Sequence, residues 1–83
     1  MKFKDLKFEG EVEDVQAFVV CGKYEVSVVR NALSYGGEKG LYEIGVFHKG
    51  TEYMCDPLNW GDDVKGWLTP ELVEKELALI SEL

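Results

Sequence analysis

The middle of the chain holds the clearest pattern of hydrophobic and polar positions. In Tyr24–Asn31, and again in Leu41–His48, the two kinds of residue alternate with a period of two. Successive side chains of a β-strand point to opposite faces, so both stretches predict strands. The predicted inner face is apolar, and its residues are Tyr24, Val26, Val28, Tyr42, Ile44 and Val46. The opposite face, with Glu25, Ser27, Glu43 and Gly45, is expected to meet solvent or a partner.

The first quarter of the chain has a weaker pattern. Lys2–Phe8 predicts a first strand, which Glu9–Glu11 would interrupt. Val12–Cys21 fits helical spacing as well as a short apolar strand, and periodicity alone does not separate the two for so short a run. We predict a strand over Ala17–Cys21, because Gly22 and Lys23 follow it as a hairpin turn.

Glycine and proline divide the second half of the chain. Lys49 and Gly50 predict a turn, after which Thr51–Cys55 returns as the partner of the preceding strand. Residues 57–63 are expected to form a loop. Val64–Leu68 is interpreted as a single helical turn, with Asp62 or Asp63 as its N-cap.

The last helix has the strongest start signal in the chain. Thr69 is a typical N-cap, Pro70 suits the first helical position and Glu71 lies in the first turn. The helix is predicted from Pro70 to about Glu82. At 100° per residue its apolar side chains cover a wide arc, made of Leu72, Val73, Leu77, Leu79, Ile80 and Leu83.

Glu76 falls inside this apolar arc and allows two interpretations. In one, the arc packs on the sheet with one half and on another chain with the other half. In the other, Glu76 sits at the edge of the contact and reaches water, and we favour this second interpretation.

Together these elements predict an α+β fold in one domain, residues 1–83. It is an antiparallel sheet of four to five strands with a C-terminal helix packed on one face. A chain of 83 residues forms only a thin core, because small domains bury about 60% of the surface that their unfolded chains expose.

Charge is distributed unevenly. The net charge is -7, and nearly all of it comes from residues 41–83, which carry three basic and nine acidic side chains. A nucleic-acid-binding protein would show the opposite sign, and the same holds for a protein that binds an anionic membrane. The expected partner is therefore a protein with a basic surface. The plainer alternative is that the acidic surface only keeps a small protein in solution.

Two cysteines, Cys21 and Cys55, are fewer than a small secreted scaffold of this length usually carries. The first residues have no apolar run typical of a signal peptide, and nothing in the sequence approaches the roughly 20 apolar residues of a membrane span. We expect free thiols and a cytoplasmic location.

Catalytic and metal-binding patterns are missing from the sequence. A metal site needs several Cys, His or carboxylate ligands at short spacing, but His48 is the single histidine and there is no C-x-x-C. The glycine-rich stretch 34–40 lacks the phosphate-binding pattern G-x-x-x-x-G-K-[ST]. We therefore expect neither a cofactor nor an enzyme.

Aromatic side chains in loops are the best candidates for binding. Trp60 stands beside Gly61, Asp62 and Asp63, and Tyr35 stands in the glycine-rich stretch. Aromatic residues next to charge are typical anchors of binding surfaces, although Trp60 could equally close one end of the core. Trp67, just before the helix, is expected to belong to the core. The predicted partner-binding residues are Tyr35, Trp60, Asp62, Asp63 and Glu76.

Four segments resemble small uncharacterised proteins of bacteriophages and prophages: Tyr24–Arg30, Ser34–Gly37, Gly40–Ile44 and Gly66–Glu71. The resemblance implies a class, namely short accessory proteins made in an infected bacterium, many of which bind and inhibit a host or defence protein. The leading hypothesis is an inhibitor that occupies a basic nucleic-acid-binding surface. The alternative is a self-associating structural or assembly protein, a homodimer for example, that uses the C-terminal helix.

Overall fold

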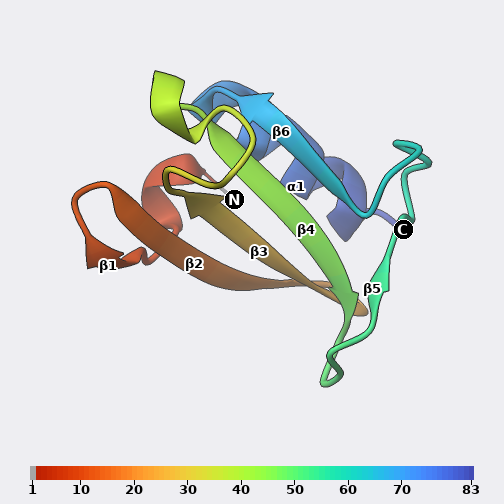
Figure 1. The fold of residues 1–83 in the computed structure, drawn as a ribbon. Helices are drawn as coiled ribbons and strands as arrows, with labels where there is room; N and C mark the ends of the chain where they lie inside the picture. Colours follow the sequence, from red (N-terminus) through yellow and green to blue (C-terminus); the bar gives the residue numbers. More distant parts are fainter. Residues whose placement is uncertain (1) are drawn as a thin grey trace.

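The computed structural model, which describes residues 2–83, is an antiparallel sheet with one α-helix (Figure 1). Five strands follow one another in sheet order: β1 (Glu9–Glu11), β2 (Asp14–Cys21), β3 (Tyr24–Arg30), β4 (Tyr42–His48) and β5 (Met54–Cys55). A sixth strand, β6 (Val64–Leu68), also pairs with β4. The helix α1 (Pro70–Ser81) ends the chain, and two short 3-10 helices cover Phe3–Asp5 and Gly37–Lys39.

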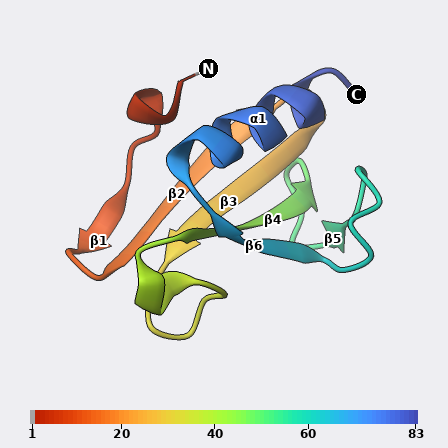
Figure 2. The ribbon, with the colours of Figure 1, turned by 90° about the horizontal axis from the view of Figure 1, so that it is seen from above.

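The helix α1 covers one side of the sheet, as the view from above shows (Figure 2). It turns Val73, Leu77 and Ile80 toward the sheet, and all three are almost completely buried. These side chains pack against the predicted inner face of β3 and β4, and against Ala17 and Cys21 of β2. The predicted α+β class, with the helix packed on one face, is confirmed, and the sheet has six strands.

The helix begins where the sequence predicts. Thr69 is extended and its Oγ1 accepts a hydrogen bond from the Leu72 N–H at 3.3 Å. Pro70 follows at the first helical position, where its missing N–H costs nothing. The cap and the proline fix the point at which the chain leaves β6 and crosses the sheet.

The strand prediction for Lys2–Phe8 is wrong. Phe3–Asp5 forms a 3-10 turn, and the Phe3 N–H donates to the Glu74 carboxylate of α1 at 2.5 Å. The rings of Phe3 and Phe8 pack on Tyr42 and close one end of the core. This packing explains why the apolar residues Phe3, Leu6 and Phe8 do not alternate. A strand would place them on both of its faces and could not bury all three on one side.

Glu9–Glu11, predicted to interrupt the sheet, is the edge strand β1. All three residues are exposed and pair with Asp14–Gln16 of β2. An edge strand made of charged residues and glycine buries nothing, so it leaves no hydrophobic pattern in the sequence.

Two predictions in the second half also need correction. Val64–Leu68 is the strand β6 and not a helical turn, because it supplies backbone partners to the outer edge of β4. One extra residue of β6 bulges out between the pairs Ile44–Lys65 and Tyr42–Leu68, which hides the alternation of a strand. The predicted strand Thr51–Cys55 is reduced to Met54–Cys55.

Candidate functional site

Among the described residues 2–83, no second layer covers the side of the sheet that faces away from α1. Figure 1 looks onto this side, with α1 behind the sheet. Cross-strand pairs fix its composition, because partners in register share a face: Phe18 pairs with Ser27, Ser27 with Gly45 and Gly45 with Val64. We call it the uncovered face. Its residues are Gln16, Phe18, Val20, Glu25, Ser27, Val29, Glu43, Gly45, Phe47, Met54 and Val64.

Large apolar side chains stand in solvent on the uncovered face. Phe18 is 60% exposed, Val20 50% and Met54 40%. Phe47, Val29 and Val64 lie around them and are partly buried. Apolar side chains that cluster on an exposed sheet face, and are not scattered singly, are typical of interaction surfaces.

Small residues make the centre of the uncovered face lower than its surroundings. Ser27 and Gly45 are cross-strand partners, and the Ser27 hydroxyl accepts a hydrogen bond from the Gln16 side-chain amide at 2.9 Å. The Met54 methyl group would lie 2.9 Å from a Cβ on Gly45, so Met54 reaches over the glycine. Apolar contacts thus surround a shallow polar centre.

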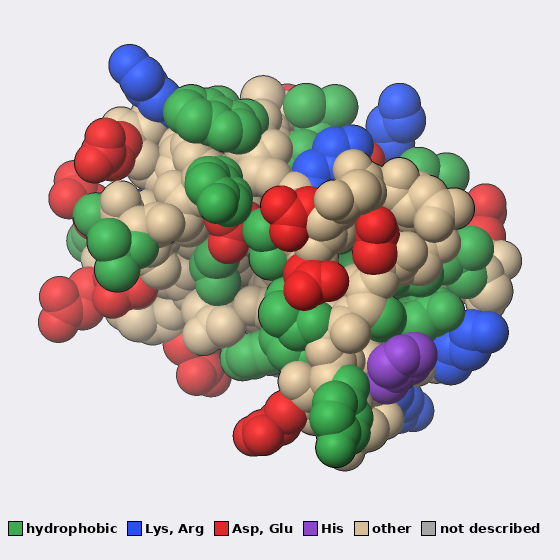
Figure 3. All heavy atoms as spheres, turned by 45° about the vertical axis from the view of Figure 1, so that its right-hand side comes forward, with side chains coloured by type: hydrophobic (Ala, Val, Ile, Leu, Met, Phe, Trp, Pro, Cys, Tyr) green, Lys and Arg blue, Asp and Glu red, His purple; other side chains and the backbone are tan. Residues whose placement is uncertain are grey.

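Carboxylates provide the charge of this side. Glu25 and Glu43 belong to the uncovered face, and none of the residues that form the face is Lys or Arg. On the same side, Glu9, Glu11 and Asp14 line a hollow of about 600 Å³ beside Phe18, with Lys7 as its single base. Figure 3 shows acidic and hydrophobic side chains side by side across the middle of the view, with most Lys and Arg side chains near its outline.

Tyr35 joins the uncovered face at one end. The Tyr35 N–H donates to the Glu43 carboxylate at 2.8 Å, and the Tyr35 Cβ lies directly over Gly66 of β6. The Tyr35 side chain is 57% exposed. Tyr35 is therefore accessible at this end of the uncovered face, and its role in binding a partner stays a prediction.

Trp67 was expected in the core, and that prediction is wrong. Its side chain is 58% exposed, and its N–H donates to the Tyr35 carbonyl oxygen at 3.1 Å. The bulge of β6 turns Trp67 outward while its neighbour Leu68 faces the core. Sequence reasoning missed it because the bulge breaks the alternation that would have indicated an outward position.

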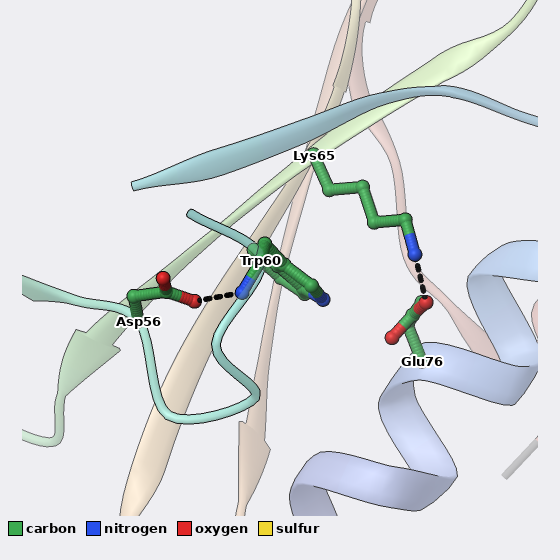
Figure 4. A network of polar contacts seen from close by, with 4 residues as sticks. All are labelled: Asp56, Trp60, Lys65 and Glu76. Atoms are coloured by element: carbon green, nitrogen blue, oxygen red, sulfur yellow. Dashed lines mark hydrogen bonds and ion pairs between the residues drawn. The ribbon is translucent and has the colours of Figure 1, made fainter. Parts of the chain in front are cut away.

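Trp60 has an intermediate position. It is partly buried and packs against the core, and its indole ring points from the loop toward Lys65 of β6 and Glu76 of α1 (Figure 4). The loop is held by Asp56, whose carboxylate accepts hydrogen bonds from the N–H groups of Trp60 and Gly61 at 2.7 and 2.9 Å. This position favours a role in closing the core.

Glu76 does not reach water as predicted. Its side chain is 9% exposed, and its Oε1 lies 2.6 Å from the Lys65 ammonium of β6, whose side chain is 42% exposed (Figure 4). The cation on β6 explains how a carboxylate occupies a buried position on the helix. Glu76 is therefore occupied by a contact inside the chain.

The five predicted contact residues do not form one cluster. Tyr35 borders the uncovered face, and so does Asp63, whose carbonyl oxygen would lie 4.0 Å from a Cβ added at Gly45. Asp62 and Asp63 are exposed. The residues that sequence reasoning missed are Phe18, Val20, Phe47 and Met54. For Phe18 and Val20 a signal is present in Phe18–Cys21, where consecutive apolar residues place apolar side chains on both faces of a strand.

The pKa of the Cys55 thiol is shifted upward. Burial raises the pKa of the Cys55 thiol, and the nearby carboxylates of Asp56 and Asp63 raise it further. Each of these causes disfavours the thiolate, so Cys55 is unsuited to act as a nucleophile. Both cysteines are free thiols.

Within the described residues 2–83, no three or more His, Cys, Asp or Glu side chains come together in a way that could hold a metal ion. No helix of that part of the chain has the length and apolar character that crossing a membrane requires.

Comparison with known proteins found no match: no family model, no curated protein and no solved structure is similar to this chain.

Proposed function

We propose that this chain binds a protein partner with a basic surface, and that the partner docks on the uncovered face. The observation that supports this most is the combination on one side of the sheet of exposed Phe18, Val20 and Met54 with carboxylates. Apolar side chains supply the contact area, and the excess of carboxylates over Lys and Arg on this side favours a cationic partner.

The kind of partner follows from charge. With a net charge of -7 the chain has the same sign of charge as nucleic acid, and the two repel each other. A protein surface that normally binds nucleic acid is basic, and an acidic, partly apolar face is complementary to it. We propose a host or defence protein of an infected bacterium as the partner, inhibited because its nucleic-acid-binding surface is blocked.

Capture from a bacterial lysate with three versions of the chain tests this proposal. The versions are the wild type, a Phe18→Ser/Val20→Ser variant and a Leu79→Ser control. Leu79 is also an exposed apolar residue, but it lies on α1, on the other side of the sheet. We expect a basic protein that the wild type and the control retain and that the double variant loses.

Two results would contradict the proposal. One is a captured protein that all three versions retain equally, because the uncovered face would then be irrelevant to it. The other is a captured partner that duplex DNA does not displace, because its nucleic-acid-binding surface would then be free.

Self-association through α1 is a second candidate. Leu72, Leu79 and Leu83 are exposed at 42%, 41% and 50%, so the outer half of the predicted apolar arc is not covered by the sheet. Sedimentation at high micromolar concentration tests it: a wild-type dimer that Leu79→Ser converts to monomer would support it. A wild-type monomer would remove it.

A further inference from the structure

Trp67 has a backbone conformation that large side chains avoid. Its φ is 59°, in the left-handed region, which costs an L-residue about 1–2 kcal/mol. The bulge of β6 imposes this angle, because β6 has one residue more than β4 between the pairs Ile44–Lys65 and Tyr42–Leu68. Glycine and asparagine are the residues that usually occupy such positions.

The loop that precedes β4 contacts the backbone of Trp67: a Cβ on Gly36 would lie 2.9 Å from the Trp67 Cα, and the Tyr35 carbonyl oxygen accepts a hydrogen bond from the Trp67 backbone N–H. Both contacts survive with another residue. A strained backbone that displays a mostly exposed aromatic ring points to a contact outside the chain.

A second exposed aromatic residue stands next to it. Tyr35, Gly36 and Trp67 line a hollow of about 240 Å³, together with Glu38 and Lys39 of the following 3-10 helix. The hollow thus combines two aromatic residues with the carboxylate of Glu38 and the ammonium group of Lys39. Glu43 lies close by but already accepts the Tyr35 N–H.

We propose that Tyr35 and Trp67 hold an arginine side chain of the partner, with Glu38 pairing its guanidinium group. The inference rests on the proposed function, since it places an anchor for the basic partner at the end of the uncovered face. A guanidinium is planar and weakly hydrated, so it stacks on aromatic rings and pairs with a carboxylate. A lysine ammonium is a compact, strongly hydrated charge, and Lys39 repels it without a stacking contact to compensate.

The strain itself gives the first test, which needs no partner. Trp67→Asn removes the ring and suits the left-handed backbone, so the urea midpoint of unfolding should stay the same or rise. Trp60→Asn is the matched control, because Trp60 packs against the core and its loss should lower the midpoint. A Trp67→Asn midpoint lowered as much as the Trp60→Asn midpoint would show that the Trp67 ring serves the fold, and would overturn the proposal.

The second test titrates the chain with short peptides of equal length: Ac-Gly-Arg-Gly-Arg-Gly-amide and its counterparts with Lys or Pro in place of Arg. Two indole N–H signals, from Trp60 and Trp67, are followed by NMR. We expect the arginine peptide to shift the Trp67 signal and leave the Trp60 signal in place. Its affinity should exceed that of the lysine peptide about two- to fivefold, the gain of a cation–π contact at an exposed site.

Each alternative result contradicts the proposal in a different way. Equal shifts with arginine and lysine peptides would indicate charge attraction without stacking, and a preference for the proline peptide would indicate an apolar occupant. Leu79→Ser, on the other side of the sheet, should leave the peptide response unchanged. The lysate experiment can fail while the arginine peptide still shifts the Trp67 signal. In that case the partner does not dock on the uncovered face, and the arginine site at Tyr35 and Trp67 is retained.

Discussion

Glu76 is the acidic residue that α1 turns toward the sheet, and Lys65 of β6 meets it at 2.6 Å. The cost of burying a carboxylate is offset here by one cation across the contact between helix and sheet. Because Lys65 extends from the strand that precedes α1, the pair also ties the two elements together. The wide apolar arc of the helix can therefore include the charged Glu76 and still pack against the sheet.

Lys65→Met should destabilise the chain by about 2 kcal/mol. Removing the cation leaves the Glu76 carboxylate buried without a partner, which costs about 3–5 kcal/mol in a fully buried pair and less here because the Lys65 side chain is 42% exposed. The free energy of unfolding in urea measures the effect. Lys65→Met with Glu76→Leu should recover most of the loss, and an unchanged stability in Lys65→Met would mean that Glu76 reaches water after all.

Cys55 should react slowly with iodoacetamide at neutral pH. Burial, Asp56 and Asp63 all raise the pKa of the thiol, so the reactive thiolate becomes populated only at a higher pH than in a free cysteine. The alkylation rate, followed by peptide mass spectrometry, should therefore rise over a more alkaline range than that of N-acetylcysteine. Asp63→Asn should move the profile part of the way back. A profile that coincides with that of the free thiol would contradict the shift.

At the scale of elements, the sequence was sufficient where side chains alternate or where a cap is present. The strands β3 and β4 and the helix α1 have such signals, and their positions were predicted closely. The segment Lys2–Phe8 and the strand β6 were predicted wrongly for opposite reasons. The first buries its apolar residues in a non-repetitive way, and the second pairs through backbone groups across a bulge that the sequence does not reveal.

Gly66 tests the contact between β6 and the loop that precedes β4. A Cβ at Gly66 would lie 2.3 Å from the Tyr35 Cβ and 2.8 Å from its carbonyl oxygen. Gly66→Ala should therefore push the Tyr35 loop away and cost about 2 kcal/mol, a usual price of overpacking. Thermal unfolding measures this.

Gly45→Ala is the matched control, because its new Cβ would meet the flexible Met54 methyl group, which can move aside. Its cost should be less than about 1 kcal/mol. Equal losses for Gly45→Ala and Gly66→Ala would show that Tyr35 is not held against β6.

At the scale of the whole molecule, the sequence predicted the charge of the surface better than the position of its exposed apolar residues. The acidic excess and Tyr35 were visible directly, whereas the run Phe18–Cys21 showed apolar side chains on both faces of a strand, and the register of β2 then placed Phe18 and Val20 on the face turned away from α1. Trp67, expected in the core, is 58% exposed, and Trp60, for which the sequence left both positions open, is partly buried. A partly buried loop and an exposed bulge cannot be told apart from neighbouring residues alone.

Asp62→Lys with Asp63→Lys should slow association with the captured partner about tenfold at low ionic strength. The two substitutions move the net charge of -7 by four units toward zero and place cations at the border of the uncovered face. The difference from the wild type should fade near 1 M salt, where the screening length is about 3 Å. Stopped-flow or surface-based kinetics measure both, and equal association rates at low salt would mean that the acidic surface serves solubility alone.

The most direct measurement of the central claim is a methyl NMR titration of the labelled chain with its captured partner. Val20, Val29 and Val64 report on the uncovered face; Leu72 and Leu79 report on the outer side of α1, and Leu83 reports on the segment just after it. Docking on the uncovered face predicts that the three valine signals shift or broaden while the three leucine signals stay in place. Leucine signals that move while the valine signals remain would contradict the account and assign the partner to α1.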